Sequence, residues 1–209
     1  HLSIRRQRQM CIRDSGYAGP GPLAINPAIT PTLPYNVARD FQPVSQAVEA
    51  ALLLAVTTAL PVKDIKGLIA LARKRPGELS NASAGTGTIG HLAGEYFKML
   101  TTTNILHVPY KGGGQATADV MSGHVQMLFD PLTGVGVHLQ SGRLRALAVT
   151  GRKRLAAFPD LPTVAESGVP GYEVMTWGGI LAPAGIPRPV LDRLNAEMQR
   201  AVRSPVIIE

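Results

Sequence analysis

Residues 81–91 read Asn-Ala-Ser-Ala-Gly-Thr-Gly-Thr-Ile-Gly-His, a run of glycines and hydroxyl side chains between an expected short strand and an expected helix. The backbone N–H groups in the first turn of a helix have no intrahelical acceptor, and the helix dipole adds about half a positive charge there. Glycine lets a ligand oxygen approach the backbone closely. The stretch therefore predicts a strand–loop–helix junction that can bind an anion.

Short apolar runs alternate with helical patterns along most of the chain. The expected strands are 51–56, 79–84, 105–110, 125–129 and 144–150, and the expected helices are 62–75, 88–100, 112–121, 135–140 and 187–202. Strands that alternate with helices on short loops imply parallel pairing, because parallel neighbours need crossover connections. The sequence therefore predicts the α/β class.

Composition indicates a globular protein, with 45% hydrophobic and 17% charged residues among 209. The net charge is +7, but four arginines against one aspartate place +3 of it in residues 1–15, leaving +4 for the rest of the chain. That remainder is ordinary and gives no argument for a nucleic-acid partner. The longest apolar run, 50–60, is far shorter than the roughly 20 residues that span a bilayer, so no membrane anchor is expected.

Residues 1–15 do not resemble the sequence that follows. They lack the apolar region and the cleavage site of a secretory signal, and we expect them to be a non-native segment. A basic arm for nucleic acid or membrane is the alternative. The segment contains Cys11, the one cysteine in the sequence, and a chain otherwise free of cysteine suits an oxidising compartment.

The glycines Gly85, Gly87 and Gly90 satisfy the pattern G-x-G-x-x-G, so an NADP-dependent oxidoreductase is the alternative function. Dinucleotide binding needs an apolar strand before the loop and an acidic residue about 20 positions later. Residues 78–83 are mostly polar and no acidic residue stands at the required distance, although Lys111 would suit a 2′-phosphate. These departures count against a dinucleotide site.

A nucleophile elbow is a further alternative, with Ser83 as nucleophile and His91 and Asp130 as its partners. That pattern requires glycine where Asn81 stands. In hydrolases of this kind the histidine also comes after the acid in the chain, whereas His91 comes before it. A first-turn residue that caps or packs locally is the simpler interpretation of His91.

Reversible binding of a carboxylate needs only N–H donors, hydroxyl donors and a suitable shape. Such groups are available from Ser83, Gly85, Thr86, Gly87 and Thr88. The purely structural alternative is a tight turn before a helix whose N-cap is Thr86 or Thr88. The loop alone leaves both interpretations open.

Several other segments, in order and spacing, resemble one family over nearly the whole chain after residue 20. They are 21–28, 33–35, 40–44, 82–94, 107–112, 129–131, 142–150, 162–168 and 181–185. Together they resemble the periplasmic solute-binding proteins of tripartite tricarboxylate transporters, the Bug family.

The resemblance implies a type II periplasmic binding-protein fold, in which two lobes with mixed, mostly parallel sheets are joined by a hinge and close on the ligand. Residues 51–172 would form a nearly complete second lobe, and residues 16–50 and 173–209 part of the first. Family members begin with a strand and a glycine-rich loop that this sequence does not contain. We therefore expect a chain truncated at both ends, which by itself binds di- or tricarboxylates very weakly or not at all.

The resemblance also implies the site. In the family, two loops, one per lobe, hold one ligand carboxylate largely through backbone N–H groups, hydroxyls and waters, and the second-lobe loop corresponds to residues 83–88. Asp130 matches a position that faces the ligand and helps to set its identity, with a cap before Pro131 as the alternative. Lys111 could approach an anion, although a solvated lysine is the simpler interpretation.

The function implied by the resemblance is capture of a small organic acid for uptake or sensing, without catalysis, metal or cofactor. We expect a periplasmic monomer whose partner is the membrane component of a tripartite tricarboxylate transporter. No nucleic acid partner and no direct membrane insertion are expected.

Overall fold

The computed structural model describes residues 16–204, so the segment expected to be non-native lies outside the described residues. The chain divides into two compact units. Unit 1 contains the described residues up to Glu49 and from Trp177 onward, and unit 2 is Ala50–Thr176. Each unit is described separately.

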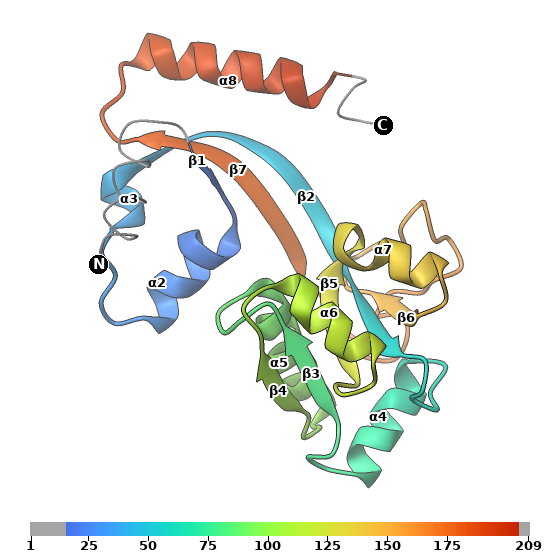
Figure 1. The fold of residues 1–209 in the computed structure, drawn as a ribbon. Helices are drawn as coiled ribbons and strands as arrows, with labels where there is room; N and C mark the ends of the chain where they lie inside the picture. The colour runs from blue at the N-terminus through green and yellow to red at the C-terminus, as the bar shows by residue number, and fades with distance from the viewer. Residues whose placement is uncertain (1–15, 205–209) are drawn as a thin grey trace. The chain divides into compact units, whose positions relative to one another are not determined.

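Unit 2 contains the strands and helices of a layered α/β structure (Figure 1). Its elements are the part of β2 (Phe41–Thr57) from Ala50 on, α4 (Ile65–Lys74), β3 (Ser80–Ser83), α5 (Ile89–Thr101), β4 (Leu106–Pro109), α6 (Gly113–Met121), β5 (Met127–Pro131), α7 (Leu132–Gln140) and β6 (Leu144–Val149).

The strands of unit 2 are ordered β6-β2-β5-β3-β4. β3 pairs in parallel with both β4 and β5, and β2 pairs antiparallel with both β5 and β6. Four of these strands therefore run in one direction and β2 alone runs in the other. The sheet is mixed and mostly parallel, as predicted.

The buried half of β2 shows why this strand is an unbroken apolar run. Leu52, Leu54 and Val56 join one hydrophobic cluster, whereas Leu53 and Ala55 join the other. Successive side chains of a strand point to opposite faces, so both faces of β2 are covered. Because both faces of β2 are buried, apolar and polar residues do not alternate along it.

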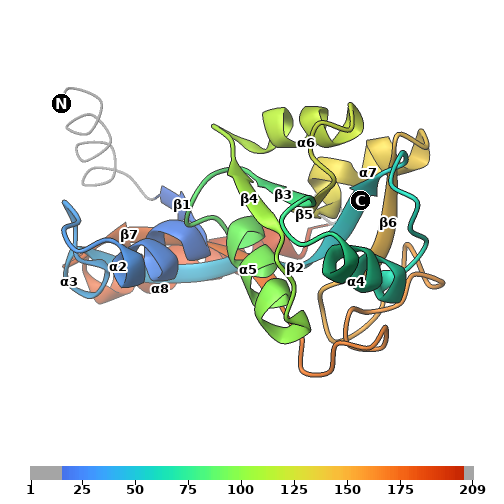
Figure 2. The same cartoon turned by 90° about the horizontal axis from the view of Figure 1, so that it is seen from below.

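Helices cover the two faces of this sheet in pairs. α4 and α5 contribute to the cluster on one face, and α6 and α7 to the cluster on the other. Figure 2 shows the same division, with α6 and α7 on one side of the strands and α4 and α5 on the opposite side.

Glycines allow α5 to lie close to the sheet. A side chain at Gly94 would overlap the side chain of Asn81 in β3, and a Cβ at Gly90 would lie 2.5 Å from the carbonyl oxygen of Phe129 in β5. Both positions therefore require the absence of a side chain, and they fix how near the first turns of α5 come to the strands.

Unit 1 contains β1 (Gly16–Ala18), η1 (Gly21–Ile25), α2 (Asn26–Ile29), α3 (Val37–Asp40), the first part of β2, β7 (Met175–Pro183) from Trp177 on, and α8 (Arg188–Val202). β1 pairs antiparallel with β7, and β7 is also a neighbour of β2. Val44, Ala182 and Leu191 form a small core between these strands and α8.

β2 is antiparallel to both of its neighbours, and this strand makes the sheet mixed. One prediction about the strands needs correction. The first strand was expected to begin at Ala51, whereas β2 begins at Phe41. Its first residues are only partly buried and include Pro43, which is unusual inside a strand and hides the pattern.

No helix in residues 16–204 is long and apolar enough to cross a membrane.

Substitution of Gly90 by alanine tests the close approach of α5 to β5. The added Cβ would lie 2.5 Å from the Phe129 carbonyl oxygen, so the helix must move away from the strand. We expect the free energy of unfolding to fall by about 1–3 kcal/mol, as measured by urea unfolding followed by circular dichroism.

Gly114 in α6 provides the matched control, because nothing lies within 4 Å of a Cβ added there. Gly114→Ala should leave stability unchanged or raise it by up to about 1 kcal/mol, since alanine is the better helix former. Equal stability of Gly90→Ala and the unsubstituted chain would contradict the close approach.

Candidate anion-binding site

Three strands of unit 2 end at the same edge of the sheet. Ser83 of β3 is in parallel register with Pro109 of β4, and Ala82 is in register with Leu128 of β5. Because parallel strands have their carboxyl ends on one side, the loops that follow β3, β4 and β5 emerge together. Each of these loops leads directly into a helix.

The three helices that begin at this edge have no side-chain cap. The N-cap residues are Thr88 for α5, Gly112 for α6 and Pro131 for α7, and none makes a side-chain hydrogen bond to its helix. By contrast, the Asp64 carboxylate of α4 accepts a hydrogen bond of 2.7 Å from the Gly67 N–H. The edge therefore presents helix N-termini whose N–H groups and dipoles favour an anion.

The glycines of the loop after β3 adopt backbone angles that favour glycine. The φ angle is 142° at Gly85 and 77° at Gly87. A Cβ at Gly85 would also lie 3.2 Å from the carbonyl oxygen of Tyr110, in the loop after β4. Two glycines of the G-x-G-x-x-G pattern are thus explained by conformation, and the third, Gly90, by its packing on β5.

Most hydroxyl groups of this loop bond to the loop itself. The Ser83 hydroxyl accepts from Gly85 N–H at 3.2 Å and lies 3.0 Å from the Gly85 carbonyl and 2.7 Å from His107 Nε2. The Thr88 hydroxyl donates to the same carbonyl at 2.7 Å and so does not cap α5. Thr86 is exposed. Ser83 and Thr88 therefore shape the loop, while Thr86 faces solvent.

Asp130 lies between the first turns of two uncapped helices. A side chain at Gly134 in α7 would overlap its carboxylate, and one at Gly113 in α6 would lie 4.0 Å from its Oδ1. Within residues 16–204, no group donates a hydrogen bond or forms an ion pair with this carboxylate. Burial raises the pKa of Asp130 to about 6. Lys111, in the loop before α6, is exposed.

Two histidines that the sequence did not assign to ligand binding contact the loop after β3. The rings of His91 in α5 and His107 in β4 stack with centroids 4.0 Å apart. His91 Nδ1 accepts a hydrogen bond of 3.2 Å from the Gly87 N–H. His107 occurs in sequence as a lone histidine in an expected strand, so only the strand order reveals that it contacts Ser83.

The nucleophile elbow is not formed. Ser83 is buried, with 3% of its surface exposed, and it contacts His107 rather than His91. Asp130 makes no hydrogen bond to either histidine among the described residues. A buried serine with no carboxylate to orient its histidine lacks the arrangement of a hydrolase.

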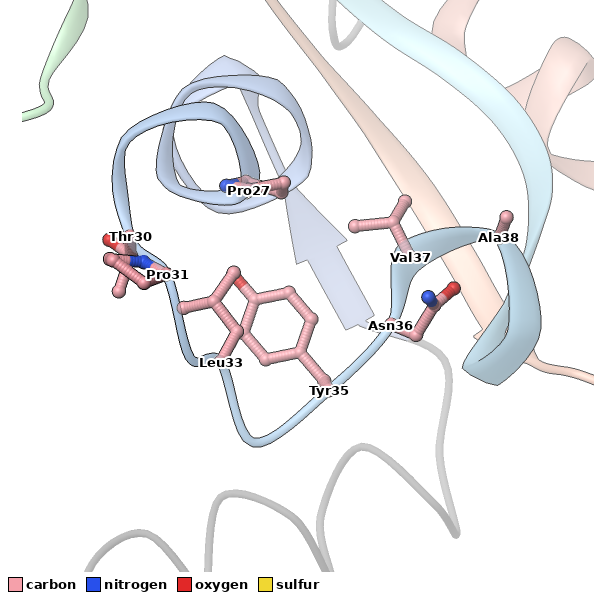
Figure 3. Close-up of a pocket in the computed structure, with 8 residues that line it drawn as sticks. All are labelled: Pro27, Thr30, Pro31, Leu33, Tyr35, Asn36, Val37 and Ala38. Carbon is pink, nitrogen blue, oxygen red and sulfur yellow. The ribbon is translucent and has the colours of Figure 1, made fainter.

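Unit 1 also contains a surface pocket. It has a volume of about 370 Å³ and is lined by Pro27, Thr30, Pro31, Leu33, Tyr35, Asn36, Val37 and Ala38 (Figure 3). The Tyr35 hydroxyl already donates to the Pro22 carbonyl, and the Asn36 side chain accepts from Arg39 N–H. With no charged lining residue, this pocket offers little to an anion. The described residues contain no group of three metal-ligating side chains.

Unit 2 is thus a layered α/β structure with three helix N-termini, none with a side-chain cap, at one edge of its sheet. The chain belongs to the tripartite tricarboxylate transporter family of receptors, whose family model matches residues 17–209. This membership confirms the resemblance seen in the sequence. The family consists of receptors and not enzymes, which confirms that the chain is not an enzyme.

Proteins with similar sequences support this family assignment. The chain is 41% identical over 188 residues to the UPF0065 protein of the tcbD-tcbE intergenic region of Pseudomonas sp. strain P51, covering 90% of this chain and 56% of the relative. It is 35% identical over 188 residues to the protein BugT of Bordetella pertussis, covering 90% of this chain and 58% of BugT. The chain thus spans little more than half the length of these relatives.

Solved structures share the fold. Rpa4515 of R. palustris with adipate has a TM-score of 0.87 at 38% identity, over 91% of this chain and 64% of that one. MatC of Rhodopseudomonas palustris with bound malate has a TM-score of 0.87 at 27% identity, over 99% and 71%. The periplasmic binding protein BugD also has a TM-score of 0.87, at 30% identity, over 96% and 69%. The predicted periplasmic binding-protein fold is confirmed.

Asp130→Asn tests the burial of the carboxylate. With a pKa near 6 in the folded chain and near 4 when unfolded, Asp130 binds its proton more tightly in the folded state. Its contribution to stability is therefore complete below about pH 4 and is lost as the pH rises through about 6. We expect the asparagine variant to be more stable than the unsubstituted chain by about 2 kcal/mol at pH 7.5.

This difference should shrink toward zero at pH 4, and urea unfolding at several pH values measures it. The control is Asp160→Asn, the same substitution at an exposed position. A constant difference between Asp130→Asn and the unsubstituted chain over pH 4–7.5 would show that Asp130 does not titrate in this way.

Proposed function

We propose that this chain is part of a periplasmic solute-binding protein that captures a small organic carboxylate for uptake or sensing. The observation that carries the proposal is the convergence of the uncapped N-termini of α5, α6 and α7 at one edge of the unit 2 sheet. A carboxylate placed there would accept hydrogen bonds from backbone N–H groups and gain from the helix dipoles.

The loop residues have two different proposed roles, shaping the backbone and contacting the ligand. Gly85 and Gly87 permit the backbone path that presents the N–H groups, and Ser83 and Thr88 hold that path through their bonds to the Gly85 carbonyl or N–H. The exposed Thr86 hydroxyl is left to donate to the ligand. These five residues are the proposed ligand-binding set of the loop.

Asp130 is proposed to influence which acid is bound. Its carboxylate lies beside the starts of α6 and α7 and disfavours a second negative charge at close range. A ligand group that donates a hydrogen bond, such as a hydroxyl or a protonated carboxyl, would be favoured instead.

The solved relatives support a carboxylate as the ligand class, since Rpa4515 was solved with adipate and MatC with malate. We assign unit 2 to the second lobe of the family fold and unit 1 to the first. The proposed partner of the whole protein is the membrane component of a tripartite tricarboxylate transporter, in keeping with the family to which the chain belongs.

Nuclear magnetic resonance of the nitrogen-15-labelled chain tests the proposal and also detects weak binding. Titration with succinate, malate or adipate to tens of millimolar should shift amide signals of residues 85–91, 112–114 and 131–134. Thr86→Ala should weaken binding about threefold to tenfold, the usual effect of one lost hydrogen bond. Thr86→Ser, which keeps the hydroxyl, should bind like the unsubstituted chain.

Succinamide, which has the same length but no charge, is the ligand control and should leave these signals unmoved. Shifts scattered over the surface, or none at the three helix N-termini with any of the acids, would refute the proposed site.

A further inference from the structure

His91 holds one amide of the ligand loop. Its Nδ1 accepts the Gly87 N–H at 3.2 Å. An atom that accepts from an amide must carry its lone pair, so neutral His91 has its proton on Nε2. Protonation of Nδ1 would set one N–H against another and break this bond. The observed loop conformation therefore belongs to neutral His91.

His107 holds the same loop from the neighbouring strand. Its Nε2 lies 2.7 Å from the Ser83 hydroxyl, which in turn bonds to Gly85. The two histidines thus fix the loop at two points four residues apart, one through a backbone amide and one through a side chain.

The two rings cannot both be charged without cost. They stack with centroids 4.0 Å apart and planes 28° apart, and 18% of the His91 side chain is exposed. Burial lowers the pKa of His107, and the nearby His91 lowers it further. A proton on His91 therefore disfavours a proton on His107.

The charged groups that face the pair come from α5. Glu95 Oε1 lies 4.0 Å from His91 Nε2, and Lys98 Nζ lies 2.8 Å from the same carboxylate oxygen. From β3, among the described residues, the hydrogen-bonding contact is the neutral Ser83 hydroxyl. Because Lys98 already pairs with Glu95, the charge near the stack changes chiefly when a histidine gains a proton.

We propose that His91 and His107 act as a pair of positioning residues for the ligand loop, and that protonation of the pair strengthens the binding of an anion there. In the neutral pair, His91 occupies the Gly87 amide. A proton on His91 releases that N–H toward the site and adds a positive charge behind the loop. This inference rests on the proposed function, because it assumes that the loop binds a carboxylate.

The direction of the pH effect on affinity follows from the linkage between proton binding and anion binding. A bound anion favours the protonated pair, so the pair takes up protons on binding and affinity rises as the pH falls. A fully linked proton changes affinity at most tenfold for each pH unit, and partial linkage gives less. We expect this pair to contribute a threefold to tenfold gain in affinity between pH 7.5 and pH 5.5, on the order expected for one proton.

The first experiment needs no ligand. It uses Asp130→Asn as the reference chain, so that Asp130 does not titrate in the same range. In this chain the Gly87 amide signal should shift with pH with the same midpoint as the His91 ring signals. His91→Asn keeps an acceptor, Oδ1, near the place of Nδ1 but cannot titrate, so its Gly87 signal should not follow pH.

His107→Gln likewise keeps a polar atom near the place of Nε2 and removes the second titrating ring. The Gly87 signal of this variant should still follow pH, because His91 is retained and accepts from that amide. His124→Gln, at an exposed histidine, is the control and should change neither signal. A Gly87 amide that does not move between pH 4.5 and pH 8 in the reference chain overturns the proposal.

The second experiment measures succinate affinity at pH 7.5 and pH 5.5 by the same titration. Protonation of succinate itself affects every variant equally, so the comparison is between variants. The gain in succinate affinity between pH 7.5 and pH 5.5 should be threefold to tenfold greater in the reference chain than in the reference chain that also carries His91→Asn. Equal gains in the two chains overturn the coupling between the histidines and the ligand.

The two experiments distinguish the role of the histidine pair from the presence of the carboxylate site. Failure of succinate and the other acids to bind refutes the carboxylate site, and with it the link to affinity, while the Gly87 titration still decides whether His91 controls the loop. If succinate binds at the helix N-termini but the Gly87 amide does not respond to pH, the carboxylate site is supported and the proposed role of the histidine pair is refuted.

Discussion

The parallel pairing of β3 with both β4 and β5 is the constraint on which the rest of unit 2 depends. Parallel strands must be joined by crossovers, so each of these strands is followed by a loop and a helix that begin at the same edge. The convergence of three helix N-termini is a consequence of that pairing and needs no separate explanation. None of the three helices has a side-chain cap. Gly112 and Pro131 have no side-chain acceptor to offer, and the Thr88 hydroxyl donates to the Gly85 carbonyl instead of capping α5.

Local sequence patterns predict the elements of unit 2 well and their directions less well. α4 and α5 were expected within a few residues of where they lie, because their apolar spacing and, for α4, the run of basic residues before Pro76 are local signals. β2 runs opposite to the other four strands of its sheet, and no local pattern within β2 encodes that direction. Its start at Phe41 was missed for a different reason, since partial burial and Pro43 obscure the strand pattern.

In the candidate site, too, some features can be predicted from local sequence, whereas others depend on contacts between residues far apart in the chain. The conformations of Gly85 and Gly87 and the position of Asp130 at a strand end follow from local sequence and from the α/β class. The contact of Ser83 with His107 and the stack of His107 on His91 join residues from two strands and a helix. Such contacts become visible only when the strand order is known, and they show that the Ser83 hydroxyl fixes the shape of the loop.

The string Gly85-Thr-Gly-Thr-Ile-Gly90 bears on how genome sequences are interpreted. Two of its glycines adopt angles that other residues avoid, and the third lets a helix approach a neighbouring strand. A nucleotide-binding fold selects glycine at the equivalent spacing for similar mechanical reasons, a tight turn and close packing of helix on strand. The same six-letter pattern can therefore arise in receptors with no nucleotide ligand, and a search by pattern alone would place such receptors among dehydrogenases. In this chain, the polar residues before the string and the lack of an acidic residue about 20 positions after it are the departures from the dinucleotide-binding pattern.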